Sequence, residues 1–329
     1  MYQFVDGEWG DPAALTDENG DFEREATTFR SRVSADANAE FPVASGRYHL
    51  YVSLACPWAH RTLITRALRG LADVISVNVV DPYRDENGWQ FTPEKAGCTP
   101  DTATGASYLR ELYVAADPNY TGRVTVPVLW DRKTETIVNN ESAEIMRMFD
   151  TAFAEFGRSS VTLFPEGYRE EIDRLIESIY GPINNGVYRA GFATTQSAYE
   201  SAVDELFDAL DQYNELLSTQ RYLAGDRLTE ADLAMFTTLI RFDDVYHTHF
   251  FCNRRKISEY DALWNYCKEL YQLPDVAQTV NLKHIREHYY RTHTDINPKG
   301  IVAVGPGHDF TAPHDRDRFA GGPPPELTR

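Results

Sequence analysis

The sequence predicts an α/β domain followed by an all-α domain, in a chain of 329 residues. In the first half, short apolar runs with strand periodicity alternate with helical segments, whereas the periodic segments after about residue 166 all have helical spacing. The chain is also longer than one hydrophobic core usually serves, so two domains are expected. We assign an N-terminal extension to residues 1–40, the α/β domain to 41–152, a linker to 153–166, the helical domain to 167–293 and a tail to 294–329.

A predicted strand over residues 48–55 leads directly into Cys56, which is followed by Pro57. Proline suits the first position of a helix, and we expect this helix to end before Gly70. Because the amides at a helix start favour an anion, a cysteine there can have its pKa lowered from about 8.5 to roughly 3.5–7.5. Ala59 stands where a dithiol oxidoreductase has its second cysteine. We therefore predict a monothiol nucleophile at Cys56, with a buried core cysteine as the alternative.

The next segments complete the α/β domain. An apolar run over 73–80 predicts a strand that forms a βαβ unit with the strand and helix before it, and so lies parallel to the first strand. An irregular segment over 81–122 is rich in proline, glycine, aspartate and threonine, and it contains Trp89. It is too long for an ordinary connection, so we expect an insertion or a functional loop. Two short strands follow over 126–130 and 136–138.

Two features near these last strands bear on ligand binding. Pro127, within an apparent strand, must occupy an edge position or a bulge, or follow a cis peptide bond that would expose backbone groups of Val126 to a ligand. Glu141 and Ser142 stand at the start of a helix, where backbone amides can bind an anion such as the carboxylate of a peptide. An ordinary N-cap explains these two residues equally well.

The second domain is predicted to be helical throughout. Its periodic apolar positions fall within residues 168–180, 197–217, 230–243, 258–273 and 275–291. Thr229 and Asp232 form a capping box at the start of the third of these helices, and Leu228 is placed to act as its hydrophobic staple. The tail after His293 is rich in glycine and proline, and we expect it to wrap the surface and then fray.

The formal charge of -18 excludes several classes of partner. There is no excess of lysine and arginine to neutralise phosphates, so neither nucleic acid nor an anionic membrane is an expected partner. Only six of the 32 basic residues are lysine. Such an acidic, lysine-poor composition fits a salt-rich cytoplasm, where the Debye length falls to about 3 Å at 1 M salt. We therefore expect a halophilic host.

Sequence features also bear on localisation. No apolar run reaches the roughly 18 residues of a membrane helix, and the N-terminus lacks the basic flank and apolar stretch of a signal peptide. The cysteines are too few and too scattered for a disulfide framework; they are Cys56, Cys98, Cys252 and Cys267. We expect a cytoplasmic protein in a reducing compartment.

Two constellations could be drawn as metal sites. His247 and His249 lie near Cys252, and His284 and His288 have the i, i+4 spacing of one helix face. Neither completes a tetrahedral set of ligands, so we predict no metal. Another alternative concerns Cys98, which could in principle resolve Cys56 through a distant disulfide.

Six motifs together resemble the glutathionyl-hydroquinone reductases, the xi class of glutathione transferases. They are Cys-Pro-Trp-Ala-His-Arg at 56–61, Trp89, Thr-Val-Pro-Val-Leu-Trp at 125–130, Asn-Asn-Glu-Ser-Ala-Glu-Ile at 139–145, Arg-Phe-Asp-Asp-Val-Tyr at 241–246 and Asn-Pro-Lys-Gly-Ile-Val at 297–302. The resemblance spans nearly the whole chain. It implies a thioredoxin-like domain joined to a helical domain of the glutathione-transferase type, usually in a homodimer.

The resemblance also implies a reaction and the residues that perform it. The Cys56 thiolate would attack the sulfur of a glutathionyl-hydroquinone and expel the hydroquinone, and a second glutathione would release the mixed disulfide. Trp89, Arg123, Val126, Glu141 and Ser142 would bind the thiol: Arg123 at a carboxylate, the Val126 backbone at the cysteinyl unit, and Glu141 and Ser142 at the γ-glutamyl end.

Three tyrosines would line the aromatic site: Tyr188 and Tyr289 as catalytic groups, and Tyr246 in contact with the substrate. A phenol suits this role because its hydroxyl can hydrogen-bond a leaving phenolate while its ring packs on the quinol. With 19 tyrosines in the chain, a purely structural role is the alternative for any one of them.

Two other functions, and one other thiol cosubstrate, are also consistent with the sequence. An omega-type thiol transferase or dehydroascorbate reductase would use the same monothiol chemistry, whereas a non-catalytic interaction module would need no reactive cysteine. The thiol cosubstrate is glutathione or, in a halophilic archaeon, γ-glutamylcysteine, which differs from it in lacking the terminal glycine.

Overall fold

The computed structural model describes residues 2–10 and 14–328, which form two compact units. The α/β unit contains the described residues up to Ala14 together with residues 25–159. The helical unit contains residues 15–24 and the described residues from Ser160 onward. The short segment 15–24 therefore belongs to the helical unit, although it lies within the N-terminal extension of the sequence.

A four-stranded mixed sheet forms the centre of the α/β unit. Its strand order is β6-β5-β7-β8, with β5 at Tyr48–Val52, β6 at Ser76–Val79, β7 at Val128–Asp131 and β8 at Thr136–Asn139. β5 pairs with β6 in parallel, as the βαβ pattern predicts, whereas β7 pairs antiparallel with both β5 and β8. Every residue of β5 is buried, because this strand has neighbours on both edges.

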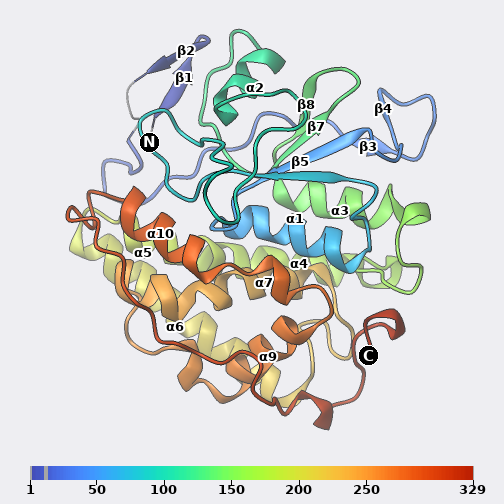
Figure 1. The fold of residues 1–329 in the computed structure, drawn as a ribbon. Coiled ribbons are helices and arrows are strands. Elements are labelled where there is room, and N and C mark those ends of the chain that lie inside the picture. The colour runs from blue at the N-terminus through green and yellow to red at the C-terminus, as the bar shows by residue number, and fades with distance from the viewer. Residues whose placement is uncertain (1, 11–13, 329) are drawn as a thin grey trace. The chain divides into compact units, whose positions relative to one another are not determined.

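Helices pack on both faces of this sheet (Figure 1). α1 (Pro57–Leu68) lies beside α3 (Ser142–Thr151) on one face, and α2 (Leu109–Ala116) lies on the other. α1 begins at Pro57 and is followed by Gly70 with φ of +72°, so both predicted ends are confirmed.

The expectation of an irregular segment over 81–122 is wrong in one respect, because α2 lies within it. Glu111 caps this helix by accepting a hydrogen bond from the Tyr108 amide at 2.8 Å. Leu109, Leu112 and Tyr113 bury its apolar face. With only eight residues, the helix is too short for its periodicity to stand out in the sequence.

The N-terminal residues add two small sheets to the α/β unit. β1 (Gln3–Val5) pairs antiparallel with β2 (Glu8–Gly10), and β3 (Val33–Ser34) pairs in parallel with β4 (Phe41–Pro42).

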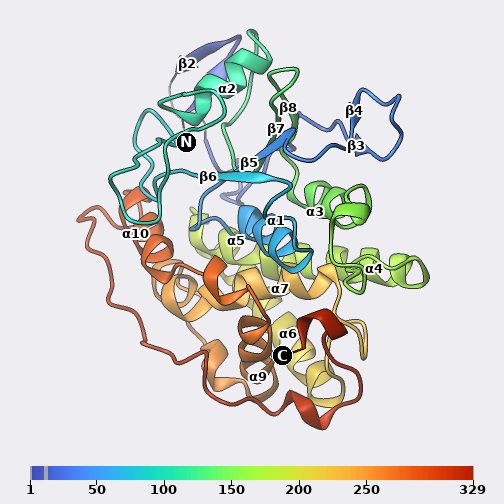
Figure 2. The same ribbon diagram turned by 45° about the vertical axis from the view of Figure 1, so that its right-hand side comes forward.

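The helical unit consists of helices and connecting turns (Figure 2). Its α-helices are α4 (Arg169–Ile179), α5 (Gly186–Phe192), α6 (Gln196–Thr219), α7 (Glu230–Arg241), α8 (His247–His249), α9 (Asp261–Gln272) and α10 (Leu282–Thr292). π-helical turns occupy Tyr180–Asn184 and Phe242–Tyr246. Short 3-10 turns lie at Ala154–Phe156 in the α/β unit and, in the helical unit, at Glu166–Tyr168, Ile257–Glu259, Ala277–Thr279, Arg316–Arg318 and Pro325–Leu327.

Two helix predictions need correction. The last helix begins at Leu282 and not at Asp275, because Asp275 has φ of +68° and the side chain of Asn281 caps the helix by accepting from the His284 amide at 3.0 Å. The sequence patterns also missed α5, whose seven residues include two glycines, and glycine disfavours a helix.

Polar contacts hold the tail at several points. His308 lies 2.7 Å from the Asp243 carboxylate and packs against the ring of Trp264. Arg316 is fully buried and donates to backbone carbonyls at the end of α6 and just after it, at residues 217, 220 and 221. Near the chain end, Leu327 is 2% exposed.

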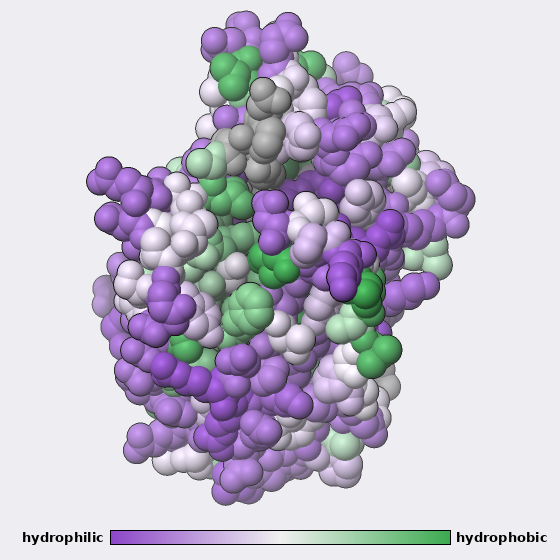
Figure 3. All heavy atoms as spheres, turned by 90° about the vertical axis from the view of Figure 1, so that its left-hand side faces the viewer, coloured by the Kyte–Doolittle hydropathy of each residue, from purple (hydrophilic) through white to green (hydrophobic). Residues whose placement is uncertain are grey.

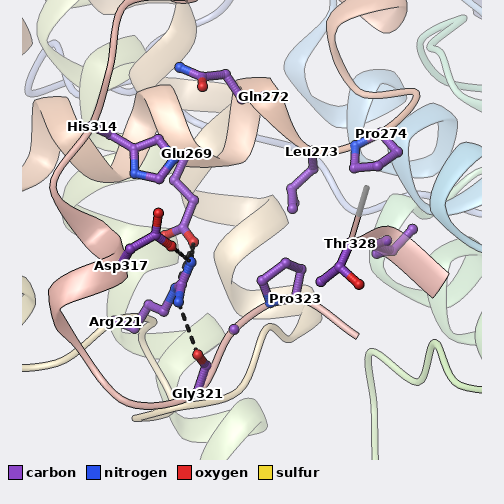
Figure 4. Close-up of a pocket in the computed structure, with 12 residues that line it drawn as sticks. Arg221, Glu269, Gln272, Leu273, Pro274, His314, Asp317, Gly321, Pro323 and Thr328 are labelled. Carbon is purple, nitrogen blue, oxygen red and sulfur yellow. Dashed lines mark hydrogen bonds and ion pairs between the residues drawn. The ribbon is translucent and has the colours of Figure 1, made fainter. Parts of the chain in front are cut away.

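A cavity of about 720 Å³ lies between α9 and this tail. Arg221 crosses it, forming an ion pair with Glu269 at 2.6 Å and donating to the carbonyl of Gly321 at 2.9 Å (Figure 4). None of the residues predicted to form the functional site lines this cavity. Arg221 anchors the tail through the Gly321 carbonyl and an ion pair with Asp317 at 2.7 Å.

Hydrophilic side chains cover most of the face shown in Figure 3, where hydrophobic atoms appear in small groups. Among the described residues, no helix has the length and apolar character needed to cross a membrane.

The capping box at the start of α7 is confirmed. Asp232 is fully buried and accepts hydrogen bonds from the amides of Thr229 (2.8 Å) and Leu223 (2.9 Å) and from the hydroxyl of Tyr266 (2.8 Å). Burial raises the pKa of this carboxyl to about 6, although each of these hydrogen bonds lowers it. The residue therefore ties together α7, the loop before it and α9.

We predict that Asp232→Ala lowers the free energy of unfolding by about 2–4 kcal/mol, because it leaves buried amides without an acceptor. Denaturant unfolding followed by circular dichroism measures this loss. Asp208→Ala, at an exposed position of α6, is the matched control and should change stability by less than about 0.5 kcal/mol. Equal stability of the two variants would show that the box does not anchor the unit.

Candidate active site

Strand directions bring four segments of the α/β unit to one edge of the sheet. β5 ends at this edge, and the register pairs Tyr51 with Val128, so β7 begins there. β8 ends there, since Asn139 pairs with Leu129 at the start of β7. β6 runs parallel to β5 and ends at the same edge. The loops that carry Cys56, Trp89, Val126 and Glu141 all leave or enter the sheet at this edge.

Cys56 is the N-cap residue of α1, as the sequence predicts. Its backbone is extended (φ −77°, ψ 123°), and its carbonyl accepts the first hydrogen bond of the helix from the His60 amide. Its thiol donates to the carbonyl oxygen of Val126 over 3.5 Å. The side chain is partly exposed, so a ligand can reach the sulfur. A thiol at a helix N-terminus in this setting is suited to nucleophilic attack.

The peptide bond between Val126 and Pro127 is cis, one of the three geometries expected from the sequence. Val126 is 5% exposed, and its carbonyl faces the thiol. The cysteinyl unit of a bound thiol would have to lie close to this backbone for its sulfur to meet Cys56.

Arg123 lies three residues before Val126 on the same loop. Its side chain is 10% exposed. Its Nε is buried without a hydrogen-bond partner among the described residues, and it lies 3.4 Å from a carboxylate oxygen of Glu25. A buried donor without a partner is costly, so this guanidinium is well suited to receive a carboxylate ligand.

Glu141 and Ser142 stand at the start of α3, as predicted. Glu141 is the N-cap, and its side chain accepts from the Ala143 amide (3.4 Å) and from the Thr27 hydroxyl (3.2 Å). The Ser142 hydroxyl donates to the same carboxylate at 3.5 Å. A carboxylate and a hydroxyl beside helix amides can bind both the ammonium and the carboxylate of a γ-glutamyl group.

Trp89 completes the group of expected thiol-site residues in the α/β unit. It is 4% exposed and lies in the loop between β6 and α2. The guanidinium of Arg84 stacks on its ring at 5.3 Å, and its carbonyl accepts from the Leu109 amide. These contacts hold the indole ring in place.

The three tyrosines predicted for the aromatic site meet in the helical unit. The hydroxyls of Tyr188 on α5 and Tyr289 on α10 are 2.6 Å apart, and those of Tyr246 and Tyr289 are 2.9 Å apart. Tyr246 lies on the π-helical turn after α7. We call this group the tyrosine triad.

Burial differs along the tyrosine triad. Tyr246 and Tyr289 are 0% and 1% exposed, whereas Tyr188 is partly exposed. Burial raises the pKa of both Tyr246 and Tyr289 well above the usual value, although the charge of Arg241 opposes the shift. Both phenols therefore stay protonated at neutral pH. If Tyr246 donates to Tyr289 and Tyr289 to Tyr188, the proton of Tyr188 is the last of the chain, at the most accessible hydroxyl.

An aromatic cluster holds the tyrosine triad in place. The ring of Phe250 lies 5.4–5.7 Å from each of the three tyrosine rings. It fits because residue 191 is glycine: a Cβ there would stand 2.2 Å from the ring of Phe250. The cluster also explains why α5 contains glycine at this position.

Sequence reasoning missed the part of the N-terminal extension that reaches the tyrosine triad. Phe22 stacks on Tyr188 with ring centroids 6.2 Å apart, and the guanidinium of Arg24 lies 4.9 Å from the same ring. Arg24 also donates to the side chain of Asn185 at 2.9 Å. A single arginine and a single phenylalanine in an irregular segment carry no local signal of such a position.

The alternative metal sites gain no support. His249 Nε2 lies 3.2 Å from His293 Nδ1, and the Cys252 thiol faces the carbonyl of Phe250. Burial lowers the pKa of His249 to about 4 and raises the pKa of Cys252. Within residues 2–10 and 14–328, no group of three or more ligating side chains could hold a metal ion.

Cys98 is buried in the α/β unit, where its thiol faces the carbonyl of Val80 at 3.7 Å. It forms no disulfide with Cys56 in this structure.

Two family models match the chain. Residues 55–152 match "Glutathione S-transferase, N-terminal domain", and residues 196–269 match "Glutathione S-transferase, C-terminal domain". The first match begins one residue before Cys56 and ends just after α3, so it covers the whole sheet edge described above.

Similar proteins extend these matches to nearly the whole chain. The glutathionyl-hydroquinone reductase YqjG of Escherichia coli is 50% identical over 325 residues, which cover 96% of this chain and 99% of YqjG. The solved structure of a xi-class glutathione transferase from Natrialba magadii is 63% identical with a TM-score of 0.93, covering 98% of each chain. The glutathione-bound structure of YqjG has a TM-score of 0.88 at 48% identity, covering 96% of this chain and all of that one.

Proposed function

The chain belongs to the glutathionyl-hydroquinone reductases, the xi class of glutathione transferases, and from this we propose that it reduces thiol conjugates of hydroquinones to free hydroquinones through a mixed disulfide at Cys56. The observation that carries this proposal is the position of Cys56. Its thiol stands at the start of α1, 3.5 Å from the Val126 carbonyl, at the sheet edge that also carries Glu141 and Ser142.

The first step transfers the thiol from the conjugate to Cys56. The thiolate attacks the conjugate's sulfur while the ring is in its keto form, in which the sulfur-bearing carbon already holds a proton. A sulfur–sulfur bond forms, the carbon–sulfur bond breaks, and its electron pair moves to the ring oxygen as a phenolate. The phenolate then takes up a proton, and the hydroquinone leaves.

The second step restores the enzyme. A second thiolate attacks the outer sulfur of the mixed disulfide and expels Cys56 as a thiolate. One conjugate and one thiol therefore give one hydroquinone and one disulfide, and no further redox partner is needed. Monothiol chemistry suffices, which agrees with Ala59 at the position of a second local cysteine.

We assign the binding of the thiol to five residues of the α/β unit. Arg123 binds a carboxylate, the Val126 backbone pairs with the cysteinyl unit, Glu141 and Ser142 hold the γ-glutamyl end, and Trp89 packs against the peptide. In support, Glu141 and Ser142 flank helix amides, and the Arg123 guanidinium has a buried donor to satisfy.

The tyrosine triad is assigned to the aromatic part of the substrate. Tyr188 donates a proton toward the departing phenolate, and Tyr289 and Tyr246 supply hydrogen bonds behind it. Because Tyr246 is fully buried in this structure, its contribution to substrate binding is indirect, through Tyr289. In support, the three hydroxyls lie within hydrogen-bond distance of one another in one chain, and Tyr188 is the least buried of the three residues.

We propose that the protein works as a cytoplasmic homodimer in a salt-accumulating host. All four cysteines lie in the described part of the chain, and none is in a disulfide, as expected in a reducing compartment. The xi-class relative from Natrialba magadii has a similar fold. In such a host the thiol is glutathione or γ-glutamylcysteine, which shares the γ-glutamyl and cysteinyl groups of glutathione.

The two alternative functions have less support. An omega-type transferase would share the chemistry of Cys56, but the 50% identical relative YqjG is named a glutathionyl-hydroquinone reductase. A non-catalytic interaction module would have no need of a partly exposed cysteine at a helix start.

We predict that Cys56→Ser abolishes reduction of a conjugate such as glutathionyl-menadiol and leaves the circular dichroism spectrum unchanged, because a serine hydroxyl cannot form the mixed disulfide. Cys98→Ser is the matched control and should retain turnover, since its thiol is buried against Val80. Full activity of Cys56→Ser would overturn the assignment, and an equal loss in Cys98→Ser would indicate a dithiol mechanism.

We predict that Tyr188→Phe and Tyr289→Phe each lower kcat by roughly 10²-fold, the lower end of general acid contributions, with little change in thiol binding. Stopped-flow measurement of hydroquinone release tests this. Tyr213→Phe removes a hydroxyl that bonds only Ser178 at 2.7 Å and should leave kcat unchanged. If neither triad variant were slower than Tyr213→Phe, the triad would be structural.

We predict that γ-glutamylcysteine supports turnover at least as well as glutathione in molar salt, and that stability falls in dilute buffer, where the charge of -18 is poorly screened. Turnover with each thiol and thermal unfolding across a salt series measure both effects. A clear preference for glutathione at every salt concentration, or full stability in dilute buffer, would contradict this.

A further inference from the structure

Three guanidinium–carboxylate pairs join residues 25–32 to the rest of the α/β unit, and they differ in strength: Arg30 and Arg32 both bind Glu144, whereas Glu25 approaches Arg123. Arg30 binds the Glu144 carboxylate through two hydrogen bonds, at 2.7 and 2.8 Å. Glu25 instead approaches Arg123 at 3.4–3.5 Å, and one of its contacts lacks hydrogen-bond geometry. Glu144 is 14% exposed, whereas Glu25 is 52% exposed. The Glu25 carboxylate is therefore the more easily displaced of the two.

Arg123 itself is held as a preformed anion site. Its Nη2 lies 3.5 Å from both Glu25 and the carbonyl of Ala14, while Nε is buried without a hydrogen bond among the described residues. The hydroxyl of Tyr120 donates to the Arg123 carbonyl at 2.9 Å, which fixes the backbone beneath the guanidinium. A ligand carboxylate that accepted hydrogen bonds from both Nε and Nη2 at normal distances would pair with the Arg123 guanidinium better than Glu25 does.

The Arg123 guanidinium lies close in the chain to the residue that faces the Cys56 sulfur. Arg123 lies three residues before Val126, whose carbonyl is 3.5 Å from the Cys56 thiol. Three residues span at most about 10–11 Å of extended chain. A γ-glutamyl thiol whose sulfur lies at Cys56 is long enough for its terminal carboxylate to reach Arg123.

We propose that Glu25 is a specificity-determining residue of the thiol site: an internal carboxylate that occupies Arg123 until the carboxylate of the thiol cosubstrate displaces it. This inference rests on the proposed function. Glu25 keeps the guanidinium partly neutralised in the empty site, and it lowers affinity for thiols that carry a carboxylate at this point by competing with that carboxylate. A thiol without a carboxylate at this point does not meet this competition, so Arg123 favours thiols that carry a carboxylate and Glu25 sets how large that preference is.

Salt sets the strength of this competition. The Glu25 carboxylate is more than half exposed, so its attraction to Arg123 is screened as the Debye length falls from about 10 Å at 0.1 M to about 3 Å at 1 M salt. The carboxylate of a bound thiol would lie against a side chain that is 10% exposed and would be screened less. High salt therefore favours the thiol over Glu25.

The test compares Glu25→Gln with the unchanged protein by calorimetric titration with S-methylglutathione, an unreactive analogue. The variant should bind it roughly two- to five-fold more tightly in 0.1 M salt, because exposed ion pairs contribute little but measurably. This gain in affinity for S-methylglutathione should be smaller in molar salt. It should be absent for the glycyl ethyl ester of the same analogue. S-methyl-γ-glutamylcysteine shows whether the cysteinyl carboxylate can take the same place.

Controls separate this inference from a structural role and from the proposed function. Glu94→Gln removes the same charge from an exposed position of the α/β unit that has no ion pair with a described residue, and it should leave all three affinities unchanged. Equal gains for the acid and the ester would mean that Glu25 acts on the fold, and an unchanged or weaker affinity for the acid would overturn the inference. If the unchanged protein neither bound the analogue nor turned over a conjugate, the proposed function itself would fail.

Discussion

The chemistry of the α/β unit depends on the antiparallel pairing of β7 with the buried central strand β5. This pairing places the start of β7 beside the end of β5, so the Val126 carbonyl faces the Cys56 thiol. The pairing of β8 with β7 then returns the chain to the same edge, where α3 begins with Glu141. A shift of one residue in either register would turn every side chain of the strand to the opposite face and separate the thiol from its neighbours.

In the helical unit, burial holds the three tyrosines of the triad in position. The tyrosine triad comes from α5, α10 and the π-helical turn after α7, and the three hydroxyls form one chain of hydrogen bonds. Phe250 and the glycine at position 191 let the rings pack closely around it. Burial keeps the two inner phenols, Tyr246 and Tyr289, protonated.

The N-terminal extension serves both groups of residues although it contains little regular structure. Arg24 lies over the ring of Tyr188 in the helical unit, and Glu25 approaches Arg123 in the α/β unit. Consecutive residues therefore carry opposite charges to different kinds of group: Arg24 to the ring of a tyrosine and Glu25 to a guanidinium. This division gives the extension a functional reason to be part of the fold.

The sequence by itself determined the features that depend on neighbours along the chain. Pro57 and Gly70 define the ends of α1, Thr229 and Asp232 cap α7, and the charge of -18 follows from composition alone. The motifs at 56–61 and 297–302 also identified the family, because they distinguish it from other glutathione transferases. Only the tertiary structure decided the rest. Tyr188 meets Tyr289 across 101 positions and Glu25 meets Arg123 across 98, while α2 and α5 are too short for their periodicity to be recognised. Contacts of this kind arise from strand register and helix packing, which no local pattern of residues encodes.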